Sequence, residues 1–352
     1  MRQSNIYISL PANIKRFLNI MPFNLLVWCL LALYLSPVFF MIVTAMMTTE
    51  QLGDKSAPLY PARIMRYAYE GQEYQIYNVP MENGIRPMAL VKPGRETSLL
   101  MNPQHPERGL VEWKGSWRTL KGVYEFYIEW GNFTRLFTSL PFPQMVRNTF
   151  FLTLLGGVGV VISSIVAAYG FARFSLPGGN LLFYILIATI LIPEKITFIP
   201  TFYVYVGILH WRATILPVLL HLFFGNAVYI FLLRQNFKSL PIDLEEAAML
   251  DGAGPLRRLF SVVLPQSWPV VITVSLLHFF YTWNETRLAS LYLGTDPRLM
   301  PVSFGVQNYQ SFIPIQNVIE ASSLIVLIVP VILLIVAQKY FMQGLVITGA
   351  EK

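Results

Sequence analysis

The residues with the clearest chemical potential lie in a polar segment, residues 237–265, between two apolar stretches. Two adjacent carboxylates, Glu245 and Glu246, are followed by the small residues Ala247 and Ala248 and by Gly252. A carboxylate accepts strong hydrogen bonds from basic side chains, and small neighbours let a second protein surface approach closely. This segment is therefore interpreted as a docking loop for a protein partner.

The local sequence of the segment predicts two short helices joined by a turn. Asp243 has the side chain of a helix cap, and Glu246, three residues later, completes the spacing of a capping box. Gly252 permits the backbone reversal that ends the first helix, and Pro255 suits the first turn of the second. An apolar face on the second helix, away from Arg257 and Arg258, is predicted from helical spacing. Its residues are Leu256, Leu259, Val262 and Val263.

A second group of polar side chains interrupts the neighbouring apolar stretches. A polar side chain that faces lipid is energetically costly, so these groups are expected to face protein, water or the membrane interface. The candidates for lining a substrate pathway are Glu194, Asn226, Tyr281, Trp283, Asn284 and Glu285. Glu194 has an alternative interpretation, because beside Lys195 it can mark a helix end at the interface. His221 and His278 are interpreted as hydrogen-bonded membrane histidines, since neither has a metal-ligand partner at a useful spacing.

Signatures of enzymes are missing from the sequence. No Gly-x-x-x-x-Gly-Lys-Ser/Thr phosphate loop occurs, and the glycines Gly156, Gly157 and Gly159 lack the lysine that such a loop needs. No His-Glu-x-x-His or Gly-x-Ser-x-Gly pattern occurs either. Cys29 is the single cysteine, which excludes an intrachain disulfide and a multi-cysteine metal site. We expect no catalytic residue, no metal site, no bound cofactor and no ATP hydrolysis by this chain.

The elements that position these groups are membrane spans. Charged residues make up 13% of the chain and hydrophobic residues 55%, and the apolar residues come in long blocks. About six blocks approach the roughly 18 to 20 residues that cross a bilayer. They are residues 21–47, 149–172, 181–205, 215–233, 269–293 and 318–337. The expected fold class is an all-α polytopic membrane protein, in which Ser164, Ala168 and Ala172 allow close helix packing.

The distribution of Lys and Arg predicts the orientation. Basic residues precede the first span and flank the docking loop, which places both in the cytoplasm. Lys339 after the last span is also expected inside, so both termini are predicted to be cytoplasmic, in a cell inner membrane. The first span is too long for a signal-peptide core and is interpreted as a retained anchor. This bias accounts for much of the net charge of +7, so lipid and not nucleic acid is the expected partner.

Residues 49–143 differ in character from the rest of the chain. They are polar and rich in Pro, Gly and Tyr, and they are too long for an ordinary connection. Alternating segments at residues 73–77, 87–91 and 109–113 predict a small antiparallel sheet. The topology places this β-rich insertion outside the cytoplasm. Three roles remain open for it: capping a transport pathway, contacting an external binding protein, or bracing the membrane core.

Glu246-Ala247-Ala248, Gly252 and then Leu264-Pro265 resemble the EAA loop of ABC importer permeases, in the form found in carbohydrate importers of the maltose type. Trp283-Asn284-Glu285 is similar to a Trp-Asn-acidic triplet of such permeases, and it combines hydrogen-bonding groups with an aromatic platform. The resemblance implies a membrane subunit that couples to a cytoplasmic ATPase through the loop. The coupling residues that it implies are Glu245, Glu246, Ala247, Ala248, Asp251, Gly252, Ala253, Leu264 and Pro265.

The resemblance also implies partners and a division of the chain. The partners are a second, homologous permease subunit, two ABC ATPase subunits that use ATP and Mg, and an extracytoplasmic solute-binding protein. The expected division is a cytoplasmic N-terminus (1–20), a first span (21–48), the insertion (49–143), a permease core (144–340) with its coupling loop (237–265), and a cytoplasmic C-terminus (341–352). Two rival functions are a secondary transporter or channel, which needs inverted repeats or charge relays that are not visible, and a membrane scaffold with an external recognition domain.

Overall fold

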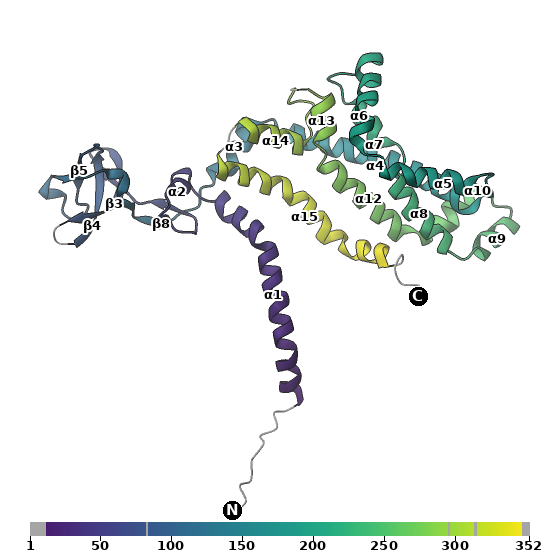
Figure 1. The fold of residues 1–352 in the computed structure, drawn as a ribbon, viewed down its shortest axis with the longest axis horizontal. Coiled ribbons are helices and arrows are strands. Elements are labelled where there is room, and N and C mark those ends of the chain that lie inside the picture. The colour runs from purple at the N-terminus through teal and green to yellow at the C-terminus, as the bar shows by residue number, and fades with distance from the viewer. Residues whose placement is uncertain (1–11, 82–83, 295, 313–314, 347–352) are drawn as a thin grey trace, which may run out of the picture. The chain divides into compact units, whose positions relative to one another are not determined.

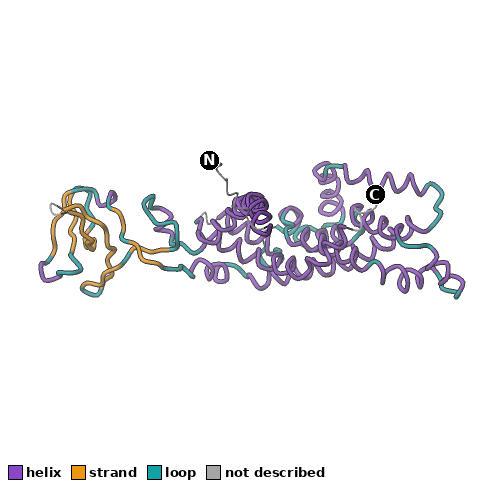
Figure 2. Tube along the Cα trace, turned by 90° about the horizontal axis from the view of Figure 1, so that it is seen from below, coloured by secondary structure: helices purple, strands orange, loops and turns teal. Residues whose placement is uncertain are grey.

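The computed structural model describes residues 12–81, 84–294, 296–312 and 315–346. The chain divides into two compact units, residues 1–132 with 315–321, and residues 133–314 with 322–352. In the described part of the chain every strand lies between Ala62 and Phe126, as the orange segments of Figure 2 show. The sequence-based prediction of a mainly helical protein with a small β-rich region is confirmed.

The first unit joins one long helix to the β-rich insertion. Helix α1 (Ala12–Ala45) is followed by the short α2 (Thr49–Gly53) and by eight strands. A two-stranded antiparallel sheet pairs β1 with β8, and a larger antiparallel sheet has the order β2-β3-β4-β5-β6 with β7 on β3. The strands are β1 (Ala62–Ile64), β2 (Arg66–Tyr69), β3 (Gln72–Met81), β4 (Gly84–Lys92), β5 (Thr97–Met101), β6 (Leu110–Lys114), β7 (Lys121–Gly122) and β8 (Tyr124–Phe126).

The insertion has its own small core. Alternation along the strands turns one set of side chains inward, and Tyr77, Val79, Met88 and Leu100 pack together there with little exposure. The segments predicted at residues 73–77, 87–91 and 109–113 fall in β3, β4 and β6. The period-2 signal was therefore sufficient to locate these three strands.

Two buried asparagines fasten the end of α1 to the start of the last helix, α15 (Gln316–Val346). Asn132 Nδ2 donates to the carbonyl oxygens of Ala45 and Met47, both at 2.9 Å. Asn317 Nδ2 donates to the Met47 carbonyl at 2.9 Å and to Asn132 Oδ1 at 3.2 Å. Both side chains are almost fully buried, so the amides satisfy backbone groups that water cannot reach. We call Asn132 and Asn317 the amide hub.

The second unit is a helical bundle arranged around α4, which lies beside α8 and α12 (Figure 1). Its helices are α3 (Gly131–Ser139), α4 (Phe142–Arg173), α5 (Gly179–Ala188), η3 (Thr189–Leu191), α6 (Glu194–Phe202), η4 (Tyr203–Ile208), α7 (Leu216–Phe223), α8 (Ala227–Ser239), α9 (Asp243–Leu250), α10 (Pro255–Arg258), η5 (Leu259–Val263), α11 (Leu264–Gln266), α12 (Trp268–Trp283), α13 (Arg287–Tyr292) and α14 (Val302–Phe312). The last helix, α15, completes the set.

Four helical segments among the described residues are long and apolar enough to cross a membrane: Met21–Ala45, Phe142–Arg173, Leu216–Ser239 and Gln316–Lys339. Two bent pairs raise the number to six if each is one span. They are Gly179–Leu191 with Ile196–Ile208, bent by 96°, and Pro255–Gln266 with Trp268–Trp283, bent by 84°. The expected third and fifth spans are therefore the broken ones, and α12 ends at Trp283, earlier than the sequence suggested.

The core of the bundle joins α4, α8, η5 and α12. Its buried side chains include Ala168 on α4, Leu233 on α8, Leu259 on η5 and Val274 on α12. Ser164 and Ala168 are fully buried, as expected for small residues at a helix contact. Gly159 allows a particularly close approach, because a Cβ atom there would lie 2.4 Å from the Phe223 ring of α7. Gly156, Gly157 and Gly159 of α4 thus serve helix packing, whereas a Cβ atom at Gly170 would meet no atom within 4 Å.

Candidate functional site

The polar segment forms the predicted hairpin of two short helices. Gly252 has a φ of 80°, the left-handed conformation that ends α9, and Pro255 begins α10. The capping prediction for Asp243 is wrong: Ile242 is the cap position of α9, no side chain caps the helix, and Asp243 is its first residue. Asp243 nevertheless stabilises the helix start, because an acidic side chain in the first turn complements the helix dipole.

The second half of the hairpin departs from a regular helix. Leu259–Val263 is a π-helical turn, and it precedes Pro265, which cannot donate a backbone hydrogen bond. Leu259 and Val263 are buried in the bundle core as predicted, whereas Leu256 is 66% exposed. The predicted apolar face is therefore shorter than the sequence suggested, and Leu256 belongs to the outer surface of the hairpin.

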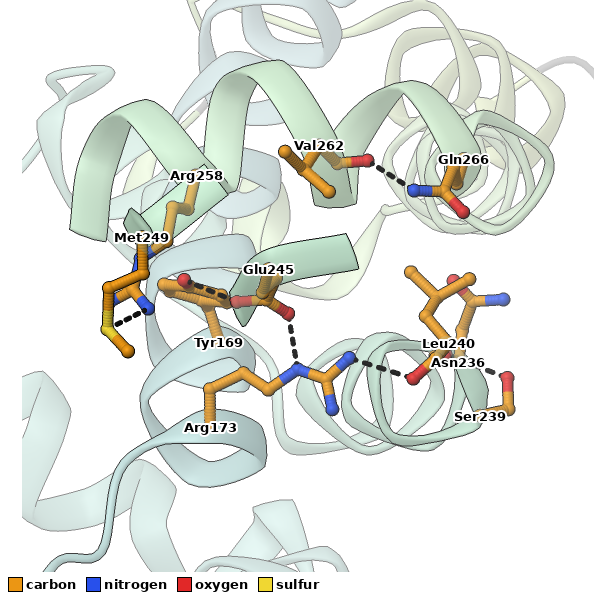
Figure 3. Close-up of polar contacts among 10 residues, drawn as sticks. All are labelled: Tyr169, Arg173, Asn236, Ser239, Leu240, Glu245, Met249, Arg258, Val262 and Gln266. Carbon is orange, nitrogen blue, oxygen red and sulfur yellow. Dashed lines mark hydrogen bonds and ion pairs between the residues drawn. The ribbon is translucent and has the colours of Figure 1, made fainter. Parts of the chain in front are cut away.

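Glu245 lies in a buried polar cluster with Tyr169 and Arg173, both at the end of α4 (Figure 3). Arg173 Nε donates to Glu245 Oε1 at 2.5 Å, and the Tyr169 hydroxyl donates to Glu245 Oε2 at 2.9 Å. Arg173 Nη2 also donates to the Leu240 carbonyl at the end of α8, at 3.0 Å. The Arg173 and Glu245 side chains are only 10% and 4% exposed. We call Tyr169, Arg173 and Glu245 the Glu245 cluster.

Glu246, one residue further, has the opposite environment. Its side chain is exposed and makes no ion pair with any residue in the described part of the chain. Other exposed positions extend this outer surface, and they include two large apolar side chains, Met249 and Leu250, at 54% and 88% exposure. Of the residues expected to couple, Ala247, Asp251, Gly252 and Pro265 are exposed, Ala248, Ala253 and Leu264 are half-buried, and Glu245 is buried.

The expected pathway residues do not form one group. Asn226 and Tyr281 line a cavity of about 420 Å³ with Val160, His221 and His278. Asn226 also accepts a hydrogen bond from the Val228 N–H and so caps α8. The cavity combines amide, imidazole and phenol groups with apolar side chains from α4, η3, α7 and α8.

Trp283 and Asn284 line a second cavity, of about 280 Å³, between α12, α14 and α15. Trp283 is buried, its Nε1 donates to the Val326 carbonyl at 3.2 Å, and Ser303 donates to the Trp283 carbonyl. Gln307 and Gln310 add amide groups to the lining. This cavity presents several groups able to bind hydroxyls.

Two expected pathway residues lie elsewhere. Glu285 lines neither of these cavities; its Oε1 accepts the Leu288 N–H at 2.6 Å and so satisfies a backbone donor in the first turn of α13. Glu194 begins α6, and its side chain lies outside the described residues. His278 is buried and lies 3.2 Å from the Thr282 hydroxyl, as expected for a hydrogen-bonded membrane histidine. No group of three or more metal-binding side chains occurs among residues that the structure describes.

A family description, "Binding-protein-dependent transport system inner membrane component", matches residues 159–346, more than half of the chain. The matched region contains the hairpin, Arg173 and the residues that line the two cavities. The chain belongs to this family. It is a permease of ABC importers, a transport subunit whose ATPase is a separate protein.

Similar proteins support the assignment of this permease. GgtD of Synechocystis sp., an osmoprotective compounds uptake permease, is 30% identical over 68% of this chain and 80% of its own length. SmoH of Agrobacterium fabrum, a sulfoquinovosyl glycerol transport permease, is 32% identical over 62% of this chain and 77% of its own. UgpE of Yersinia pestis, an sn-glycerol-3-phosphate transport permease, is 31% identical over 59% and 74%. A solved bacterial alginate importer shares the fold, with 18% identity and a TM-score of 0.64 over 95% of this chain and 99% of that one.

Sequence reasoning missed two residues of the permease site. Neither Arg173 nor Tyr169 was predicted to be a site residue. No local sequence pattern indicates either contact, because each residue is more than seventy positions from Glu245 in the sequence. A lone basic residue at the end of a span, with an acid pair in a later loop, is the pattern that would have suggested the contact.

Proposed function

We propose that this permease forms, with a second permease subunit, the membrane pathway of an importer for a sugar or oligosaccharide. The observation that carries the proposal is the different environment of two adjacent acids in the hairpin. Glu245 is buried in an ion pair, whereas Glu246 is exposed to solvent beside exposed apolar side chains. An exposed carboxylate on a short rigid helix, with apolar neighbours, is suited to a cleft on a partner protein. The relatives named for glycerol phosphate and sulfoquinovosyl glycerol support a polyhydroxylated substrate.

The mechanism follows from the hairpin. ATP-driven closure of two ATPase subunits would move α9 and α10, with Glu246 bound to a basic residue of the ATPase. Ala247, Ala248 and Gly252 keep this contact close because they have little or no side chain. Asp251 and Ala253 flank the turn, and Leu264-Pro265 leads through the 84° bend into α12. ATP and Mg are used by the ATPase, and the hairpin of this chain transmits the movement of the ATPase to the membrane helices.

Chain connectivity supports the proposed orientation. Helix α4 runs from Phe142, which follows the insertion and α3, to Arg173, which contacts the coupling hairpin. With the hairpin in the cytoplasm, the start of α4 and the insertion are extracytoplasmic. Counting six spans then returns both termini to the cytoplasm.

Both cavities are proposed as parts of the pathway. The Tyr281 cavity and the Trp283 cavity offer hydroxyl, imidazole and amide groups beside aromatic rings. Sugars are bound by hydrogen bonds to their hydroxyl groups and by contact with an aromatic face. Asn226, Tyr281, Trp283 and Asn284 remain the proposed pathway residues, whereas the hydrogen bond from the Leu288 N–H to Glu285 favours a structural function for this acid.

The insertion is proposed to brace the permease and to contact the external solute-binding protein. The amide hub at its root supports bracing, because it fixes the segments where the insertion leaves and re-enters the helical chain. Exposed apolar side chains on and near its two-stranded sheet support contact, with Leu59 at 91%, Phe126 at 69% and Trp130 at 61% exposure.

Uptake measurements test the proposed function. Cells that lack this chain are expected to lose ATP-dependent uptake of one radiolabelled sugar or oligosaccharide, and the wild-type chain restores it. The Glu246→Gln variant should reach the membrane without restoring uptake. If sugar uptake is unchanged while uptake of an amino acid or an inorganic ion is lost, the substrate assignment is wrong although the importer assignment stands.

A further inference from the structure

The coupling hairpin is attached to the bundle in two different ways. The chain joins it covalently to α8 through Leu240 and to α12 through η5 and α11. Its polar attachment to α4 is the contact of Glu245 with Tyr169 and Arg173. Motion of the hairpin therefore passes directly to α8 and α12, whereas α4 depends on side-chain contacts.

The Glu245 cluster is built as a firm attachment. Both carboxylate oxygens of Glu245 accept a hydrogen bond. Arg173 also donates a hydrogen bond to the carbonyl oxygen of Leu240, the residue that follows α8. Figure 3 shows Glu245 of α9 between the two α4 side chains. Because the ion pair is almost fully buried, loss of one partner leaves a charge without compensation, so separation is strongly unfavourable.

Helix α4 carries this attachment to the Tyr281 cavity. Val160 of α4 lines the cavity, and it precedes Arg173 by a helical length of about 20 Å. Tyr229 on α8 and Tyr281 on α12 also line it, together with residues of η3 and α7. Of these lining helices, α8 and α12 are joined to the hairpin through the chain, and α4 is joined to it through the Glu245 cluster and through the apolar core that it shares with η5.

We propose that Glu245 is a positioning residue that makes α4 follow the hairpin, so that the α4, α8 and α12 walls of the cavity move together in the transport cycle. Glu245 acts through Arg173 and Tyr169 and does not contact the ATPase. This assignment rests on the proposed importer function. The proposal gives the two adjacent acids different roles. Glu246 contacts the ATPase, and Glu245 connects the resulting movement of the hairpin to α4.

Two reporter cysteines test this proposal in the whole transporter purified from membranes. The single cysteine is first removed by Cys29→Ser, and then Val160→Cys on α4 or Tyr281→Cys on α12 is introduced. Maleimide labelling of each reporter is compared without nucleotide and after trapping with ATP and vanadate. With Glu245 present, trapping should change the labelling rate of both reporters by about fivefold or more.

The Glu245→Gln variant is expected to separate the two reporters. Labelling at Tyr281→Cys should still respond to trapping, whereas the response at Val160→Cys should be lost, with the ATPase still bound and still hydrolysing ATP. Tyr169→Phe keeps the ring and removes one hydrogen bond, so it should weaken the Val160→Cys response without abolishing it. A general folding defect would instead reduce both responses.

The matched control is Glu246→Gln, the same chemical change on the adjacent, exposed residue. It should reduce binding of the ATPase and remove the response at both reporters. An unchanged Val160→Cys response in Glu245→Gln would overturn the proposal, as would an α4 reporter that never responds with Glu245 present. If no ATPase accompanies the unaltered chain, the proposed function itself fails, which is a distinct result.

Discussion

Arg173 Nε and Glu245 Oε1 lie 2.5 Å apart although 72 residues separate them in sequence. The pair connects the end of α4 to the first turn of α9, and it is almost completely shielded from water. Glu246, the adjacent carboxylate, is exposed. Two chemically identical neighbours in one motif therefore have different physical roles, one inside the subunit and one on its docking surface.

The first prediction concerns the stability of the isolated subunit. Glu245→Ala leaves Arg173 buried without its partner, which should cost about 3–5 kcal/mol of unfolding free energy. Glu246→Ala changes an exposed side chain and should stay within about 0.5 kcal/mol. Thermal unfolding of both variants in detergent checks this difference. Equal destabilisation would contradict the buried and exposed assignments.

The turn of the hairpin supplies a second prediction. Gly252 has a φ of 80°, and a Cβ placed there meets no atom within 4 Å, so Gly252→Ala introduces backbone strain without a steric clash. The strain is expected to be about 1–2 kcal/mol. Gly252→Pro is more damaging, because it also removes the N–H that donates to the Met249 carbonyl. ATPase co-purification should fall in the order wild type, Gly252→Ala, Gly252→Pro; full retention with Gly252→Pro would refute the docking role of this turn.

The amide hub gives a third prediction. Asn317→Leu removes donors to the Met47 carbonyl and to Asn132 inside a buried site, which should cost about 1–3 kcal/mol. The control is Gln104→Leu, which replaces an exposed amide in the insertion. Thermal unfolding should show a loss for the first variant only. Similar behaviour of the two variants would indicate that the hub does not stabilise the fold.

A fourth prediction is a pH dependence in the insertion. Burial opposes ionisation of Asp54, but hydrogen bonds from Tyr124 and Ser56 outweigh it and hold the pKa of that carboxyl below its ordinary value. A lowered folded pKa stabilises the fold above the unfolded pKa, about 3.9, and this contribution is lost as the pH falls through the folded pKa. Asp54→Asn should therefore lose less stability than the wild type between pH 7 and pH 3, measured by thermal unfolding. An identical loss in both proteins would exclude this role for Asp54.

Much of the fold was predictable from the sequence because its signals are local. Long apolar runs located α1, α4 and α15, and the period-2 pattern located β3, β4 and β6. The predicted bounds of the two bent spans were less accurate, because Pro193 and the chain around Ser267 interrupt helices whose composition remains apolar. Helix α12 ends at Trp283, and Glu285 then accepts the Leu288 N–H at the start of α13, a contact that composition does not reveal.

The candidate site was only partly predictable. The left-handed Gly252 and the helix start at Pro255 follow from backbone preferences of these residues, and both are observed. Glu245 is buried in an ion pair with Arg173, a tertiary contact that the spacing of residues in the sequence does not reveal. The separation of Tyr281 and Trp283 into two cavities likewise reflects the opposite faces of one helix and the helices that cover them.

The most direct test of the central claim is purification of this chain from its native membrane in mild detergent, with mass spectrometry of the accompanying proteins and a measurement of ATP hydrolysis. We expect an ABC ATPase and a second permease to accompany the wild-type chain, with less ATPase in Glu246→Gln. Recovery of the chain without any ATPase, in several detergents and with no ATP hydrolysis, would contradict the account.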